Sequence, residues 1–291
     1  MLPKNGLFLI LSVVYGSIDP LIQAISMADV KRVVQLLEIR SSGIISSHPG
    51  VHIGRIADEN GRISLMMCGY HPKISFEEDI DERCCLIAQM LYEHGANISH
   101  SDKYGWNALA MGAVKGFTKL SQFYVSRGVP VDSVDYLGRT PLMKAAFHGY
   151  KSTVGILIEN GASISFHDNN NWTALHFCVR QVIADPVFVP VLETLLYYVR
   201  LSECPRCVID AKDGHMRSAL AYAVTGNSMY AVKLLLDAGA DPEQTDETGV
   251  ALLHSTYNDS IRELLSSKIT GNIVKDHQKW VKQESEKWSS L

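Results

Sequence analysis

The sequence of 291 residues lacks the features that define several broad classes of protein. No apolar run reaches the roughly 18 residues that a membrane-spanning helix needs. Basic residues are not in excess: 27 Lys and Arg stand against 31 Asp and Glu, giving a net charge of −4. Such a chain is a poor candidate for broad binding to nucleic-acid phosphates. With 46% apolar residues, 21 Gly and 10 Pro, the composition excludes collagen-like and mostly disordered chains.

Cysteine is also sparse, with six residues in the whole chain, too few for a disulfide scaffold. This content predicts a reducing compartment, and we expect a cytoplasmic or nuclear protein. Cys204 and Cys207 form a CxxC pair that could bind zinc or exchange thiols. Zinc needs four ligands, however, and no second CxxC or HxxxH partner is present. Residues 1–17 contain an apolar run that is either a secretory signal or a first packing element, so a secreted protein stays as an alternative.

Motifs of common enzymes are missing as well. The sequence has no GxxxxGK[ST] phosphate loop, no GxGxxG after a strand, no GxSxG elbow, no HExxH and no kinase signature. We therefore predict a protein that is not an enzyme, with no cofactor, no catalytic residue and no metal-binding residue.

What the sequence has is an internal repeat. Similar segments start at Asp102, Asp135, Asp168, Asp213 and Asp246, and three of the four spacings are 33 residues. Each Asp/Gly cluster predicts a turn. In the segment from Asp135, Thr140-Pro141 suits a helix start and Gly161 a left-handed helix end. Each segment therefore encodes a helix pair, which must stack on neighbours to bury its apolar face.

The motifs LGRTPL and LLLDAGADP, with the 33-residue period, resemble the ankyrin repeat. The resemblance covers residues 18–266 and implies an all-α solenoid of about seven stacked antiparallel helix pairs with short β-hairpin fingers. It also implies that His176 and His254, which share one repeat slot, bond between neighbouring turns.

The chain departs from this pattern at inserts near 39–57, 71–81, 182–190 and 200–207. The second insert is acidic, with Glu77, Glu78, Asp79, Asp81 and Glu82, and predicts a solvated loop or an acidic lip facing a basic partner. Residues 267–291 have an amphipathic helical pattern. This helix could cap the last repeat, form a coiled-coil contact or dock on a membrane surface.

The resemblance also implies a concave surface, lined by finger tips and first helices, that binds another protein. Large aromatic and Arg residues, which dominate binding hot spots, occupy these positions. Trp106 and Trp172 fill the same slot two repeats apart. These rings either bind a partner or pack along the next finger. The predicted partner-binding residues are Tyr104, Trp106, Tyr136, Leu137, Arg139, Phe147, His148, Asn170, Trp172 and Arg217.

The sequence thus predicts a protein–protein interaction scaffold or adaptor, with no nucleic-acid partner and no membrane span. A regulatory, redox or zinc module centred on Cys204 and Cys207 is the alternative.

Overall fold

The computed structural model describes residues 20–41, 64–70, 80–245 and 248–269. The chain divides into two compact units, an N-terminal unit of Met1–Tyr136 and a C-terminal unit of Leu137–Leu291. The described residues of both units form short helices joined by turns, and they contain no β-sheet. The predicted all-α architecture is confirmed.

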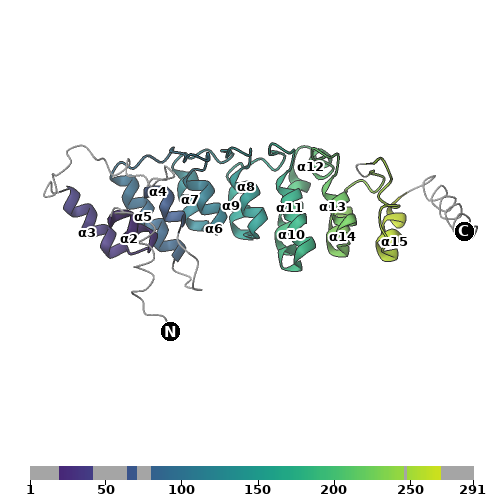
Figure 1. The fold of residues 1–291 in the computed structure, drawn as a ribbon, viewed down its shortest axis with the longest axis horizontal. Coiled ribbons are helices and arrows are strands. Elements are labelled where there is room, and N and C mark those ends of the chain that lie inside the picture. The colour runs from purple at the N-terminus through teal and green to yellow at the C-terminus, as the bar shows by residue number, and fades with distance from the viewer. Residues whose placement is uncertain (1–19, 42–63, 71–79, 246–247, 270–291) are drawn as a thin grey trace, which may run out of the picture. The chain divides into compact units, whose positions relative to one another are not determined.

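Three helix pairs make up the described N-terminal unit (Figure 1). The first layer packs α2, α4 and α6 in turn, and the second packs α3, α5 and α7. A short 3-10 turn, η2, follows α4. The bounds are α2 Pro20–Ser26, α3 Val30–Ser41, α4 Ser64–Met67, η2 Cys68–Tyr70, α5 Ile80–Glu93, α6 Ala108–Lys115 and α7 Thr118–Ser126. Because α3 continues to Ser41, the insert expected at 39–57 begins later than predicted, and its residues 42–57 lie outside the described residues.

The C-terminal unit repeats the same layering. One layer packs α8, α10 and α13, and the other packs α9, α11, α14 and α15. The bounds are α8 Pro141–His148, α9 Lys151–Glu159, α10 Ala174–Ala184, η3 Pro186–Phe188, α11 Val189–Leu201, α12 Pro205–Ile209, α13 Ala219–Thr225, α14 Met229–Asp237 and α15 Asp259–Lys268. In the last repeat, Leu252 and Leu253 are buried in a turn rather than in a first helix.

The local sequence explains how each pair starts and stops. At α8, the Thr140 Oγ1 accepts from the Met143 N–H at 3.3 Å, and Pro141 occupies the first turn. Leu142, Ala145 and Ala146 are fully buried along one face. After α9, Gly161 has φ +92° and turns the chain out of the helix, as predicted.

The insert at 182–190 lengthens α10 and adds the 3-10 turn η3 rather than forming a loop. α10 has 11 residues and α11 has 13, against 8 in α8 and 9 in α9. Asp185-Pro186 does end α10, since the residue before a proline avoids helical geometry. The insert at 200–207 ends α11 and leads into α12.

The acidic insert is only partly a loop. Asp81 and Glu82 lie in the first turn of α5. Asp81 accepts from the Lys119 and Leu120 N–H groups at 2.8 and 3.0 Å, which caps α7. Glu82 pairs with Lys119 Nζ at 2.7 Å, and this hydrogen bond lowers the pKa of Glu82. The expectation that these two residues belong to a loop is wrong, because they serve the next helix pair.

Two predicted segments lie outside the described residues, namely 1–17 and, from residue 270 onward, the C-terminal helix of 267–291. No helix in the part of the chain that the structure describes is long and apolar enough to cross a membrane.

Candidate functional site

The finger that begins at Asp168 is built around a buried carboxylate. Asp168 Oδ1 accepts from the N–H groups of Asn170 and Trp172, both at 2.8 Å. The Asp168 N–H donates to the Trp172 carbonyl at 2.9 Å, and Asn171 takes the left-handed conformation with φ +60°. Asp168 is 5% exposed, and its carboxylate stabilises the turn through these hydrogen bonds.

The next finger of the C-terminal unit repeats this geometry. Asp213 Oδ1 accepts from the N–H groups of His215 and Arg217, both at 2.9 Å, and Met216 has φ +63°. Each finger is tied to the one before it through the backbone. The Asn169 N–H donates to the Leu137 carbonyl at 3.0 Å, and the Gly214 N–H to the Asn170 carbonyl at 2.9 Å. The fingers therefore form a continuous hydrogen-bonded edge within this unit.

Close approach of the fingers also explains Gly138, which has φ +75°. A Cβ at this position would lie 2.5 Å from Asn169 Oδ1. Glycine is therefore needed here for both conformation and space.

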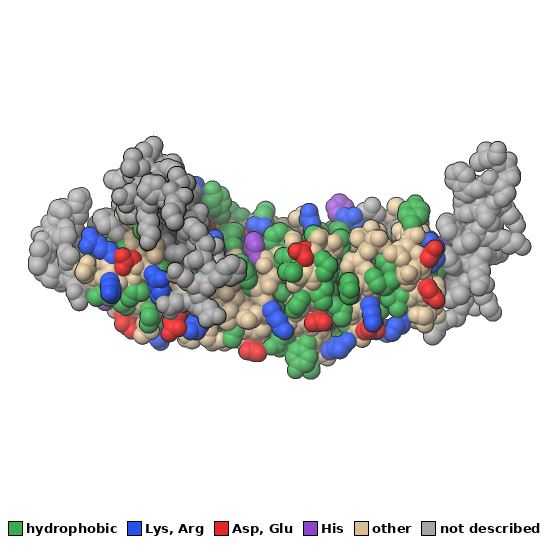
Figure 2. All heavy atoms as spheres, turned by 90° about the horizontal axis from the view of Figure 1, so that it is seen from below, with side chains coloured by type: hydrophobic (Ala, Val, Ile, Leu, Met, Phe, Trp, Pro, Cys, Tyr) green, Lys and Arg blue, Asp and Glu red, His purple; other side chains and the backbone are tan. Residues whose placement is uncertain are grey.

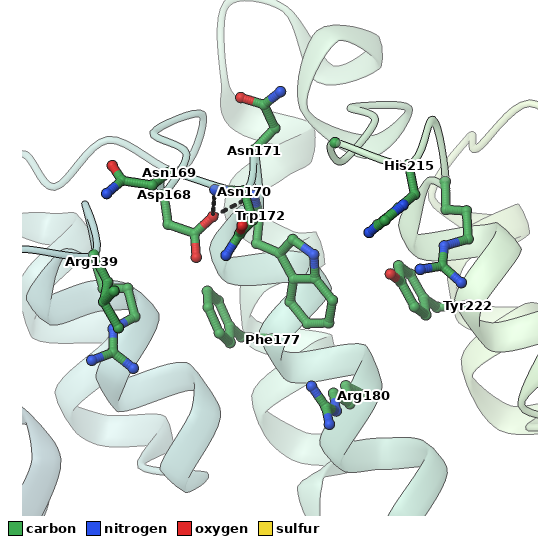
Figure 3. A pocket seen from close by; sticks show the side chains of 13 residues that line it. Arg139, Asp168, Asn169, Asn170, Asn171, Trp172, Phe177, Arg180, His215 and Tyr222 are labelled. Atoms are coloured by element: carbon green, nitrogen blue, oxygen red, sulfur yellow. Dashed lines mark hydrogen bonds between the residues drawn. The ribbon is translucent and has the colours of Figure 1, made fainter. Parts of the chain in front are cut away.

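A concavity of about 600 Å³ lies between these fingers and the first helices (Figure 3). Five of the predicted partner-binding residues line it, namely Leu137, Arg139, Asn170, Trp172 and Arg217. Residues from three successive repeats therefore meet at one site.

Aromatic rings form the centre of this concavity. The Trp172 ring lies between Phe177 and Tyr222, with both ring centroids 5.2 Å away (Figure 3). The guanidinium of Arg180 lies 5.6 Å from the Trp172 centroid, and that of Arg217 lies 4.7 Å from the Tyr222 centroid. Both distances suit cation–π contact.

A hydrogen-bonded pair fixes Tyr222. Its hydroxyl donates to Asp213 Oδ2 at 2.6 Å. Burial and this bond to a carboxylate raise the pKa of Tyr222 to about 12. Burial alone would raise the pKa of Asp213, but the bonds from Tyr222 and from two backbone N–H groups outweigh it and lower that pKa. Asp213 therefore stays ionised and holds the ring in place.

His176 links two successive repeats through a hydrogen bond. Its Nε2 lies 3.2 Å from the Arg217 carbonyl, which can only accept, so Nε2 carries the proton. Its Nδ1 then accepts from the Thr173 N–H at 3.2 Å. Burial lowers the pKa of His176, which favours this neutral form. The predicted bond between neighbouring turns is confirmed for His176.

Comparison with known proteins accounts for this repeated geometry. Residues 114–201 match a family model described as ankyrin repeats (3 copies), and residues 215–247 match a model of the single ankyrin repeat. The crystal structure of the ankyrin repeat domain of Bcl-3 superposes with a TM-score of 0.66 and 17% identity, covering 87% of this chain and 99% of that domain. The human ASB11 ankyrin repeat domain gives the same TM-score and identity over 88% of this chain and 100% of that domain.

Residues 114–201 and 215–247 carry ankyrin repeats.

Curated relatives match over shorter stretches. A probable palmitoyltransferase, AKR2, of Saccharomyces uvarum is 37% identical over 28% of this chain and 11% of its own length. The human neurogenic locus notch homolog protein 2 is 25% identical over 58% of this chain and 6% of its own length. The chain therefore spans only 11% and 6% of the length of these two relatives. Ankyrin repeats are typically non-enzymatic. The palmitoyltransferase activity in the name of AKR2 belongs to that protein.

Of the other predicted site residues, Phe147 adjoins the concavity through Phe177. Phe147 and His148 are exposed at the end of α8, and the Phe147 ring meets that of Phe177 edge-on at 6.1 Å. Tyr104, Trp106 and Tyr136 belong to the N-terminal unit, where Tyr104 is 52% and Tyr136 72% exposed and Trp106 is half-buried. It stays a prediction that the five predicted aromatic residues share one face, namely Tyr104, Trp106, Tyr136, Phe147 and Trp172.

Phe177 and Tyr222 were not among the predicted residues, although the ankyrin register could have found them. Both stand four residues after the first-helix cap, Thr173 in one repeat and Ser218 in the next. The same slot holds Lys144 in the repeat before. An aromatic side chain recurring in one repeat slot is the signal that marks the rings around Trp172.

The CxxC pair is oxidised in the structure, with a disulfide between Cys204 and Cys207. The first turn of α12, from its N-cap Cys204 to Cys207, brings the two sulfur atoms together. Cys68, Cys84, Cys85 and Cys178 are free, as expected. Among the described residues, no group of three or more His, Cys, Asp or Glu side chains is placed to hold a metal ion.

Proposed function

We propose that this ankyrin-repeat protein is a scaffold or adaptor that binds a partner protein through the concavity of its C-terminal unit. Ankyrin repeats are generally protein–protein interaction modules. The finer proposal, that binding occurs at this face, rests on the Trp172 cluster. Trp172 is half-buried between two rings and has an exposed Arg beside it. Aromatic and Arg side chains in a shared hollow are typical of binding hot spots.

Preorganisation supports the same proposal. The finger carrying Trp172 is held by the Asp168 carboxylate and by backbone bonds to both neighbouring fingers. A surface that is already ordered loses little conformational entropy when a partner binds.

The test is quantitative affinity capture with the full chain and three variants. Trp172→Ala and Arg180→Ala should each deplete the same captured protein, with Trp172→Ala weakening its binding by about tenfold or more. Arg127→Ala is the matched control, since Arg127 also stacks on two rings, Tyr92 and Phe123, but in the N-terminal unit. Arg180 is exposed, so its variant is expected to fold even if Trp172→Ala does not. Equal capture by wild type and Arg180→Ala, together with equal capture by a folded Trp172→Ala, would reject this binding face.

For location we propose the cytoplasm or nucleus, supported by the low cysteine content and the four free thiols. The Cys204–Cys207 disulfide favours the secreted alternative instead. Differential alkylation of the protein in its native cells separates the two. Free Cys204 and Cys207 thiols would support an intracellular location, and a stable disulfide would support secretion.

The disulfide also favours one second candidate function, a redox role for the turn before α12. Its two cysteines border a cavity of about 450 Å³. A chain with this role would oxidise a small dithiol and be reduced to two thiols, and Cys207→Ser would abolish that exchange. Absence of exchange by the wild-type chain would remove this candidate.

A further inference from the structure

Apart from the buried Asp168, the charged side chains that line the concavity around Trp172 are all basic. Arg139, Arg180 and Arg217 line it from three successive repeats. Its acidic residue, Asp168, is buried and accepts hydrogen bonds from the turn, so it offers little to a ligand. A partner group that enters this hollow contacts both guanidinium groups and aromatic rings.

This arrangement is local. The whole chain has a net charge of −4, and on the face drawn in Figure 2 basic and acidic side chains are interspersed along the described residues. A broad polyanion such as nucleic acid needs a continuous basic surface. Three Arg residues around one hollow suit a short acidic segment better.

The Arg side chains are also oriented by their stacking. Arg180 lies over Trp172, and Arg217 over Tyr222, whose position the Asp213 carboxylate fixes. The exposed Arg180 guanidinium, held against the Trp172 ring, can bind a carboxylate through two hydrogen bonds, whereas Arg217 Nε already lies 3.9 Å from Asp213 Oδ2. The exposed amides of Asn169 and Asn170 add donors on the finger side.

We propose that this concavity recognises an acidic peptide segment of the partner, with Asp or Glu carboxylates at the Arg groups and an apolar side chain on the Trp172 and Phe177 rings. The proposal rests on the proposed function, because it names the chemistry of the partner at the same face. It makes binding selective for charge as well as for shape.

The test uses fluorescence anisotropy with labelled eight-residue peptides and the full chain. One peptide contains Asp and Glu around a central Phe, and the second replaces every acid by its amide. We expect the acidic peptide to bind about tenfold or more tightly than the amide peptide, with affinity that falls as salt rises. A single-stranded oligothymidylate of similar length serves as a competing anion.

Variants locate the effect. Arg180→Gln should weaken the acidic peptide about three- to tenfold and leave the amide peptide unchanged. Arg180→Glu should reverse the preference toward a basic peptide. Arg127→Gln removes the same charge from a ring-stacked site in the N-terminal unit and should change affinity less than about twofold.

Three results would overturn the proposal: no binding of the acidic peptide at millimolar concentration, equal binding of both peptides, or tighter binding of oligothymidylate. The proposed function fails on a different measurement, partner capture that ignores both Trp172→Ala and Arg180→Ala. Capture that depends on Trp172 while peptide binding ignores charge would therefore reject only the acidic specificity.

Discussion

Two neighbouring helix pairs of the C-terminal unit, α8–α9 and α10–α11, show what the repeat fixes and what it leaves free. Their interiors are alike, since Leu142 and Leu175 in the first helices and Leu157 and Leu195 in the second are all fully buried. Their lengths differ, because α10 and α11 are 3 and 4 residues longer than α8 and α9. The two helix pairs therefore share the same stacking layer, while the extra residues lie at the C-terminal ends of α10 and α11.

The added residues have packing partners of their own. Phe188 lies against Gly149 at the end of α8, where a Cβ would approach its ring to 2.7 Å. Ile183 lies against Gly226 at the end of α13, where a Cβ would also approach to 2.7 Å. Glycines on both sides thus make room for the longer repeat.

The largest expected effect comes from truncating the shared interior. Leu157→Ala and Leu195→Ala should each lower the free energy of unfolding by about 2–5 kcal/mol, because each leaves a cavity in a fully buried layer. Urea denaturation followed by circular dichroism measures both. A cost confined to one of the two would show that the pairs do not share an equivalent core.

The next effect distinguishes the packing contact made by the insert from the backbone conformation that recurs in the repeats. Gly149 and Gly161 both have positive φ, at +82° and +92°, but a Cβ meets Phe188 only at Gly149. Gly161→Ala should cost about 1–2 kcal/mol from backbone strain alone. Gly149→Ala should cost about 2–4 kcal/mol, because overpacking adds to the strain. Equal costs in urea denaturation would contradict the packing of Phe188 on α8.

A smaller effect distinguishes the finger from the insert by their carboxylates. Asp168→Ala leaves two part-buried N–H groups without their acceptor and should cost about 2–3 kcal/mol. Asp185→Ala removes an exposed bond to the Val187 N–H at 2.9 Å and should cost about 1 kcal/mol or less. Thermal unfolding of the two variants provides the comparison. A larger loss for Asp185→Ala would reverse the assigned roles.

The smallest effect is a pH dependence of the free energy of unfolding, which arises where His176 of α10 bonds to the next finger. Because burial lowers the pKa of His176 below its ordinary value of 6.5, the unfolded chain takes up a proton first as the pH falls. The stability from this residue is present above about pH 6.5 and is lost as the pH falls below it toward the folded pKa. Denaturation from pH 7 to pH 5 should show this slope. In His176→Gln it should be flatter, and an unchanged slope would exclude His176 as its source.

Much of the fold follows from the sequence because the helix starts, the glycine ends and the apolar stripe recur with a fixed spacing. The conformation of the inserts does not follow, since counting extra residues locates them without saying whether they continue a helix. The position of Asp81 in a helix could not be predicted, because the residue that it caps, Lys119 at the start of α7, lies 38 residues further along the chain. Likewise, the ring cluster at Trp172 needs Tyr222 from the next repeat, and the Cys204–Cys207 bond needs the turn before α12.

The most direct test of the binding face is hydrogen–deuterium exchange of the chain with and without its captured partner. Binding at the concavity predicts slower amide exchange in the fingers and first helices at 169–177 and 214–222, and little change in α9, α11 and α14. Protection confined to α9, α11 and α14, with the two fingers unchanged, would contradict this account.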